Sequence, residues 1–404
     1  MSGPLEGVRI LDLTTVVMGP FATQLLGDLG AEVIKVEPPE GDNTRHLAPM
    51  RNPGMGAIFL HMNRNKRSIV LDLKQSAGRE ALLELARNAD VLIYNTRPQA
   101  MARLRLAYAD VRGVNAGIIY VGAFGFDQRG PYAARPAYDD LIQGAVGFPS
   151  LMLRTGATAP RYVPATLCDR IVGQATANAV LAALFHRVRT GAGQSVDVPM
   201  FETMAQFVLG DHFGGRTFVP PLGDAGYARV LARFRAPYAT RDGYICALIY
   251  NDKQWKSFFG LIGKPELFTS DARFNTHGNR AERIEEVYAF VADEMRTRTT
   301  AEWADLLSAG DIPWMPMNTL DELIDDPHLA ATGFFVRSEH PSEGAVQTTA
   351  VPTRWSASQP QMRRHAPRFG EHSAEILREA GYSTADIERM AAAGVTVLAR
   401  PVDT

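Results

Sequence analysis

Apolar and polar residues follow a regular order along the first part of the chain. Val8 to Leu13 alternates as a β-strand does, Phe21 to Leu29 repeats with the period of a helix, and Ala31 to Glu37 alternates again. This strand-helix-strand order predicts the βαβ opening of a parallel α/β sheet. Its turn carries Met18-Gly19-Pro20 and lacks the G-x-G-x-x-G pattern, so a dinucleotide site has little support. Later runs predict a helix at 77–87 and strands at 69–73, 91–95 and 118–121.

The longest helical pattern lies near the middle of the chain. Apolar residues recur with the period of a helix from Ile171 to Val188, and Thr190-Gly191 ends the pattern. Asp169 stands just before the pattern begins. A carboxylate at that position caps free N–H groups and meets the positive end of the helix dipole, so position alone predicts a helix cap. Asp139-Asp140 likewise begins a shorter predicted helix.

The pattern changes after Phe201, where a helix gives way to a segment rich in Gly and Pro. We interpret 200–224 as a linker between a large domain at 1–199 and a small domain at 225–324. In the small domain, Arg241-Asp242-Gly243 predicts a hairpin turn, and helices are expected at 252–262, 284–297 and 301–308. Residues 325–404 are expected to return to the large domain. The predicted fold class is α/β, with a parallel sheet in the large domain and a smaller α+β domain.

Composition narrows the possible functions. The 404 residues carry a net charge of -2, which is not the footprint of a protein that binds nucleic acid or an anionic membrane. The N-terminus does not resemble a secretory signal, and no apolar run is long enough to span a membrane. Cys168 and Cys246 are too few for a disulfide framework and fit a cytoplasmic protein. Cys168 is expected in the core, and no residues are expected to bind a metal.

Several long blocks of this sequence resemble one family. L-C-D-R-I-V-G at 167–173, the helix rich in small residues, and then H-R-V-R-T-G-A-G-Q-S-V-D-V-P-M-F-E-T-M resemble the central block of the class III CoA-transferases. The opening I-L-D-L-T, the block N-K-R-S-I-V-L-D and the closing F-G-E-H-S-A-E-I-L-R-E resemble the same family, and the likeness extends from Leu5 to about Ala391. It implies a Rossmann-like large domain and an interlocked homodimer in which each chain threads through its partner.

The resemblance also implies a set of functional residues. Asp169 matches the nucleophile of the family, which reacts with a coenzyme A thioester that is a substrate and not a permanently bound cofactor. Cations at Arg64, Lys66 and Arg67 suit the phosphates of CoA, although a basic cluster is more often a solvated surface. The implied CoA-binding residues are Val17, Met18, Arg67, Leu71, Asp72, Lys74, Asn95, Thr96, Arg97, Arg103, Ala137, Tyr138 and Asp139.

The resemblance implies transfer of CoA from an acyl-CoA donor such as succinyl-CoA to a carboxylic acid, with an aspartyl-CoA thioester and mixed anhydrides as intermediates. Several arginines lie at the start of the small domain. A guanidinium fork at Arg233 and Arg235 would bind the distal carboxylate of a dicarboxylic acid, unless these side chains only face the solvent.

One alternative is an α-methylacyl-CoA racemase, in which a histidine occupies the place of Tyr138. An ordinary tyrosine titrates near 10 and is a poor base at neutral pH. The other alternative is a non-catalytic relative that only binds CoA.

Overall fold

The computed structural model describes residues 3–399. The chain forms two compact units. Unit 1 contains residues up to Val146, then Val163–Gln206, then the chain from His328 onward; unit 2 contains Gly147–Tyr162 and Phe207–Pro327. The segment 147–162, which the sequence analysis places in the large domain, therefore groups with unit 2.

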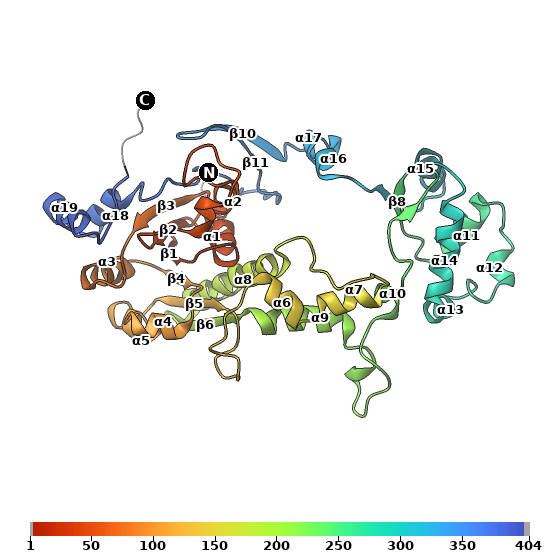
Figure 1. The fold of residues 1–404 in the computed structure, drawn as a ribbon, viewed down its shortest axis with the longest axis horizontal. Helices are drawn as coiled ribbons and strands as arrows, with labels where there is room; N and C mark the ends of the chain where they lie inside the picture. Colours follow the sequence, from red (N-terminus) through yellow and green to blue (C-terminus); the bar gives the residue numbers. More distant parts are fainter. Residues whose placement is uncertain (1–2, 400–404) are drawn as a thin grey trace. The chain divides into compact units, whose positions relative to one another are not determined.

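Unit 1 is built on a six-stranded sheet with strand order β3-β2-β1-β4-β5-β6 (Figure 1). Every neighbouring pair is parallel, which confirms the predicted parallel α/β sheet. The order runs in opposite directions from β1 and β4, so these two strands form the switch point of a doubly wound sheet. The strands are β1 (Arg9–Leu13), β2 (Glu32–Glu37), β3 (Lys66–Val70), β4 (Val91–Tyr94), β5 (Ile119–Phe124) and β6 (Ser195–Pro199).

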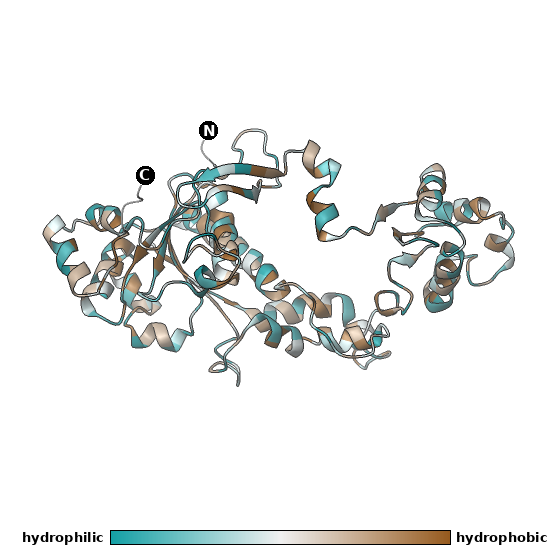
Figure 2. Ribbon diagram, turned by 45° about the horizontal axis from the view of Figure 1, so that its top comes forward, coloured by the Kyte–Doolittle hydropathy of each residue, from teal (hydrophilic) through white to brown (hydrophobic). Residues whose placement is uncertain are grey.

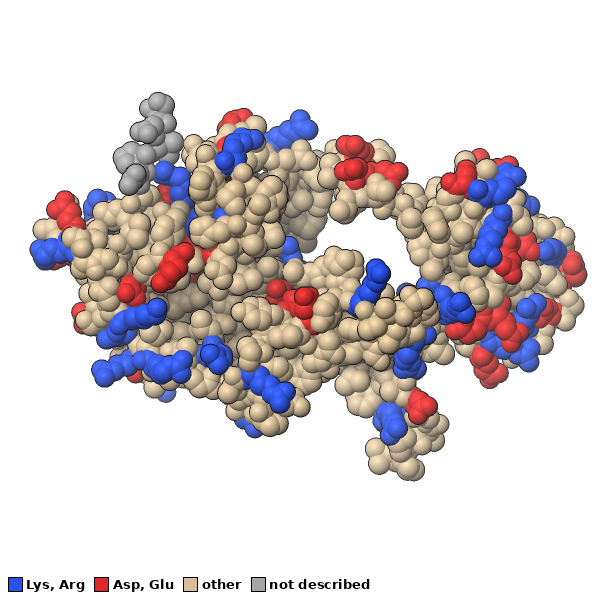
Figure 3. Space-filling model, viewed as in Figure 1, with Lys and Arg blue, Asp and Glu red and all other residues tan. Residues whose placement is uncertain are grey.

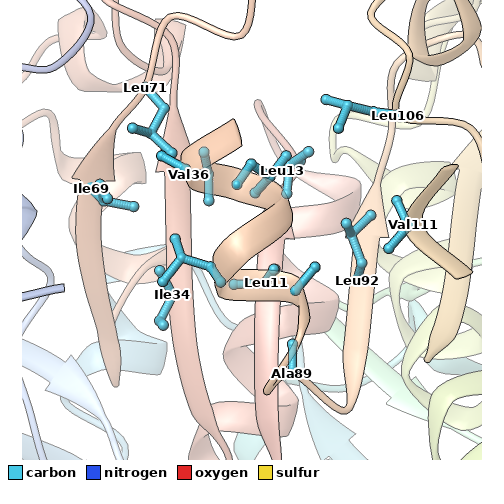
Figure 4. Packing of buried hydrophobic residues seen from close by; sticks show 14 of the residues in the cluster. Leu11, Leu13, Ile34, Val36, Ile69, Leu71, Ala89, Leu92, Leu106 and Val111 are labelled. Carbon is cyan, nitrogen blue, oxygen red and sulfur yellow. The ribbon is translucent and has the colours of Figure 1, made fainter. Parts of the chain in front are cut away.

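Helices cover both faces of this sheet. On one face, apolar side chains of the central strands pack against α3, α5 and the C-terminal helices α18 and α19. Figure 4 shows part of this cluster, with Leu11, Ile34 and Leu92 of the strands and Val111 of α5. In α19, Ile387 and Met390 are buried, and Figure 2 shows both hydrophobic and hydrophilic residues on such outer helices. On the other face, α1 packs along α8. The helices are α1 (Met18–Asp28), α2 (Ala57–Met62), α3 (Ser76–Ala86), α4 (Pro98–Arg103), α5 (Tyr108–Val114), α6 (Asp139–Ala145), α8 (Leu167–Thr190), α18 (Ser373–Glu379) and α19 (Thr384–Ala392).

The remaining elements of unit 1 are short. A 3-10 turn, η1 (Asn43–His46), follows β2, and β10 (Phe335–His340) pairs antiparallel with β11 (Gly344–Thr349). Two helices lie at the boundaries between the units, α9 (Met200–His212) and α17 (Pro327–Ala331).

The start of α8 differs from the prediction. Its N-cap is Thr166, whose carbonyl accepts a 3.1 Å hydrogen bond from Arg170 N–H, so Asp169 lies inside the first turn and is not the cap. The helix ends at Gly191 with φ 74°, as predicted.

Unit 2 is a small α+β unit with an aromatic core. Trp255, Phe258, Phe259, Phe274 and Trp303 are almost fully buried in it. Its antiparallel sheet has the order β7-β8-β9, and the predicted hairpin at 241–243 joins β7 to β8. The three predicted helices are confirmed within two residues as α11, α14 and α15. On the face seen in Figure 3, acidic and basic side chains of this unit are interspersed. Its elements are α7 (Phe148–Arg154), η2 (Gly214–Thr217), α10 (Ala228–Leu231), β7 (Tyr238–Ala239), β8 (Tyr244–Ala247), α11 (Asp252–Leu261), α12 (Leu267–Ser270), α13 (His277–Glu282), α14 (Ile284–Met295), α15 (Thr300–Ala309), β9 (Trp314–Pro316) and α16 (Leu320–Ile324).

Candidate active site

A cavity of about 430 Å³ in unit 1 lies at the carboxyl ends of the central strands. Its lining comes from the segments that follow β1, β4 and β5, together with residues 135–138, Asp169 and Met200. In doubly wound sheets, ligands bind outside the carboxyl ends of the strands at the switch point, here between β1 and β4. The topology of the sheet therefore favours this cavity as the binding site.

Helix α8 packs closely against α1 (Figure 1). This packing brings Asp169 to the cavity. One turn after Asp169, a Cβ added at Gly173 would lie only 2.7 Å from the carbonyl oxygen of Met18. Glycine at this position therefore allows the two helices to approach. The guanidinium of Arg170 lies 4.7 Å from the ring centre of Phe21 and adds a cation-π contact between the same helices.

The carboxyl group of Asp169 is an unusually strong base for an aspartate. Burial, then the neighbouring charge of Asp139, raises its pKa from 3.8 to about 7, against a smaller opposing effect of Arg170. At neutral pH the group is therefore close to half ionised. Because burial strips water from the carboxylate, its ionised form is poised to react with an electrophile that enters the cavity.

Asp139 is held rigidly beneath the cavity by two hydrogen bonds. Its Oδ1 accepts from the backbone N–H of Asp169 at 3.0 Å and its Oδ2 accepts from Nε2 of Gln143 at 2.6 Å. Gln143 is fully buried, and its Oε1 accepts from Val163 N–H at 2.8 Å while Nε2 donates to Ala165 O at 3.2 Å. These bonds join α6 to the segment that leads into α8, and they fix the orientation of the first turn of α8.

A second network holds the loop between β1 and α1. Val16 adopts φ 72°, a conformation that costs a β-branched residue about 1–3 kcal/mol. Its N–H donates to Asp42 Oδ1 at 3.3 Å, and Asp42 is paired at 2.9 Å with Lys35, both fully buried. The side chain of Asn95 bonds both the N–H and the carbonyl of Thr15, at 3.0 and 2.8 Å. These contacts compensate the strain and fix one wall of the cavity.

The N-terminus of α1 contributes polarity to the same wall. The N-cap residue Val17 and the first helical residue Met18 line the cavity, and among residues 3–399 no side chain caps the helix. The free N–H groups of the first turn and the positive end of the helix dipole therefore lie beside Asp169, where they favour an anion.

These features match a known family. The sequence model of CoA-transferase family III covers residues 5–373. The chain belongs to this family. It is 32% identical to the succinyl-CoA:glutarate CoA-transferase of Mus musculus, covering 97% of this chain and 90% of that protein. It is 33% identical to the formyl-CoA:oxalate CoA-transferase of Shigella sonnei, covering 96% of this chain and 99% of that protein. The crystal structure of a CaiB/BaiF family protein from Brucella suis superposes with a TM-score of 0.78 at 30% identity, over 94% of this chain and 100% of that one.

In this CoA-transferase, eight of the residues expected from the sequence line the one cavity: Val17, Met18, Asn95, Thr96, Arg97, Ala137, Tyr138 and Asp169. Asp139 lies behind them, 8% exposed and bonded to Asp169. The cavity lining also includes residues that the sequence analysis did not assign to the site, among them Asn43, Arg135 and Met200. Arg135 lies two residues before the Ala137-Tyr138 block, and this nearness to an implied contact was the one available signal.

The basic cluster of the CoA-transferase is placed differently. Its side chains are buried in ion pairs, so the interpretation as a solvated surface is wrong: Arg64 pairs with Asp28, Lys66 with Asp12, and Arg67 with Glu32, Glu375 and Glu379. The guanidinium of Arg67 is paired with these glutamates and lines a separate cavity together with them. Lys66 and Arg67 pair with Val33 and Ile34 of β2, so β3 begins three residues before the predicted strand.

The remaining implied contacts lie outside the Asp169 cavity. Leu71 is buried in the hydrophobic core, Asp72 accepts from Lys74 N–H at 3.0 Å in the turn before α3, and Arg103 ends α4.

Cys168 is fully buried, as predicted, and burial raises its pKa to about 12. Within the described part of the chain, no helix is long and apolar enough to cross a membrane. Residues 3–399 also contain no group of three or more His, Cys, Asp or Glu that could hold a metal ion.

Arg233 and Arg235 lie in unit 2 and are exposed. The N–H of Arg235 donates to Ala232 O at 3.0 Å and closes a turn, so the two arginines do not lie on an extended segment with their side chains on one face. The N–H of Arg233 donates to Glu285 Oε1 at 3.0 Å. Their role in substrate binding stays a prediction.

Proposed function

We propose that this class III CoA-transferase moves CoA from succinyl-CoA or a similar donor to a small dicarboxylic acid through a thioester on Asp169. The observation that carries the proposal is the partly buried Asp169 carboxyl group, whose pKa is raised to about 7, at a cavity of about 430 Å³. Relatives named for succinyl-CoA, glutarate and oxalate support a dicarboxylic acid as a substrate.

The first half of the reaction forms the thioester. The Asp169 carboxylate attacks the thioester carbonyl of the donor, which gives a mixed anhydride and CoA thiolate. The thiolate attacks the Asp169 carbonyl of the anhydride, and the donor acid leaves as a carboxylate. The second half repeats these steps in reverse with the acceptor acid. Because the thioester energy stays in a covalent bond throughout, no ATP is consumed.

The surroundings of Asp169 supply the remaining functions in this proposal. The N–H groups of Met18 and Gly19, in the first turn of α1, would stabilise the developing oxyanion and the thiolate. Arg97 and Arg135 carry the positive charge of the cavity lining and suit the phosphates of CoA. Asp139 raises the basicity of Asp169 and so its nucleophilicity. Tyr138, which lines the cavity where a racemase would have its histidine, does not favour the racemase alternative.

We also propose that the active enzyme is a homodimer. Two apolar residues of α8, Phe185 and Val188, are 64% and 82% exposed in the single chain. Large apolar side chains on one helix are typical of a surface that a partner subunit covers. Sedimentation of the protein across a dilution series tests this, and a folded monomer at low concentration would contradict it.

The proposed function is tested by incubating the protein with succinyl-CoA and a panel of carboxylic acids and reading acyl-CoA products by mass spectrometry. We expect new thioesters of small dicarboxylic acids, and none with Asp169→Asn. Retention of CoA without any exchange would favour the non-catalytic alternative.

A further inference from the structure

Unit 2 contains a second cavity, of about 240 Å³, between α10, the end of β8, and helices α11, α13 and α14. Its floor is apolar and aromatic, with Ile249, Trp255, Val287 and Tyr288 all nearly fully buried. A dry cavity of about 150 Å³ is known to admit benzene. This cavity is larger, so it has room for an aromatic ring or a short branched chain with a polar group attached.

Two arginines line the cavity, and they differ in their partners. Arg280 is buried, forms an ion pair with Asp252 and lies 6.0 Å from the ring centre of Trp255. Its charge is therefore already compensated. Arg229 lies 5.5 Å from the ring centre of Tyr250.

The environment of Arg229 leaves its charge uncompensated. Burial lowers the pKa of Arg229, but interactions with the side chains of Tyr288 and Tyr227 outweigh this, so the pKa is raised. Among residues 3–399 no carboxylate forms an ion pair with Arg229, whereas Arg280 of the same cavity pairs with Asp252. Neutral hydroxyl groups orient a guanidinium without neutralising it, so the cavity has one net positive charge beside an apolar floor.

We infer that this cavity is a binding site for a monocarboxylic acid with an apolar body about the size of a benzene ring. The ring or branched chain packs on Trp255 and Tyr288, and the carboxylate meets Arg229, whose planar fork binds both carboxylate oxygens. The site lies within unit 2 and does not depend on Asp169, so it stands or falls separately from the proposed transfer reaction.

The test uses the full-length Asp169→Asn protein, which cannot form the proposed thioester, and measures binding of phenylacetate by titration calorimetry. Phenylacetamide, which has the same shape without the charge, is the matched ligand. We expect phenylacetate to bind at least about ten-fold more tightly than the amide, the loss typical of a missing charge-assisted contact. Arg229→Gln should weaken phenylacetate by a similar factor, and Arg229→Lys should restore part of the loss.

Two further variants complete the test. Arg283→Gln removes an exposed arginine of the same unit that is not part of the cavity lining, and it should bind phenylacetate as tightly as the parent. Ala281→Phe fills the cavity from its exposed rim and should abolish binding while the melting temperature stays unchanged. Absence of phenylacetate binding at millimolar concentrations, equal affinity for acid and amide, or equal losses in Arg229→Gln and Arg283→Gln would overturn the inference.

Discussion

Replacing Asp169 by Asn should change the pH dependence of stability in a defined direction. The folded-state pKa of Asp169, about 7, lies above the ordinary 3.8, so the folded protein holds a proton that the unfolded chain has lost. The favourable contribution of the protonated group is complete below about pH 4 and is lost as the pH rises towards about pH 7. The Asn variant is neutral throughout and escapes this loss.

The size of the effect follows from the same shift. The difference between 3.8 and about 7 corresponds to roughly 4 kcal/mol at about 1.36 kcal/mol per pKa unit. This is an upper limit, because Asp169 is only partly buried and water screens its charge. Between about pH 5 and about pH 8 we expect the Asn variant to gain about 1–2 kcal/mol relative to the native protein.

The assay is thermal unfolding of both proteins across that pH range. For a unit of this size, about 1–2 kcal/mol corresponds to a difference in Tm that grows by roughly 2–8 °C. Reading only the change with pH removes any constant effect of the substitution on packing. Asp140→Asn, at the exposed neighbour of Asp139, is the matched control and should give a flat difference. A flat difference for Asp169→Asn, or a loss of stability that grows with pH, would refute the reasoning.

Further predictions concern activity. The kcat/KM should rise with pH through about 7 because only ionised Asp169 attacks, and Asp139→Asn should move this limb to lower pH; a limb unchanged in the variant would contradict the coupling. Arg135→Ala should raise the KM for acyl-CoA about 3- to 10-fold, with a weaker dependence on salt, whereas Arg129→Ala, at an exposed arginine, should not. Arg233→Ala and Arg235→Ala should lower kcat/KM for a dicarboxylic acceptor by roughly 10- to 150-fold and leave a matched monocarboxylic acceptor unaffected. Equal losses of kcat/KM on both acceptors would show that these arginines do not bind the distal carboxylate.

Much of the architecture was predictable because its signals are local. The βαβ opening, the helix that ends at Gly191 and the hairpin at 241–243 each follow from the periodicity of a few neighbouring residues. The grouping of Asn95, Ala137 and Asp169 around one cavity came instead from the resemblance to a family. Periodicity alone does not bring segments so distant in the chain together.

The errors concern contacts between distant residues. Arg67 is paired with Glu375 and Glu379, which lie 308 and 312 positions later, and a run of cations carries no sign of such partners. Asp169 was expected to cap its own helix, yet its own backbone N–H donates to Asp139 of another helix. Local sequence identified the residue types in both cases, whereas tertiary packing determined what each side chain binds.

The central claim, that the carboxyl group of Asp169 carries CoA as a thioester, is tested most directly by mass spectrometry of the protein after brief exposure to succinyl-CoA. We predict that the peptide containing Asp169 gains the mass of CoA less one water, that hydroxylamine removes this adduct, and that added acceptor acid discharges it as a new acyl-CoA. An unmodified Asp169 peptide during active turnover, or an adduct on another residue, would contradict the account.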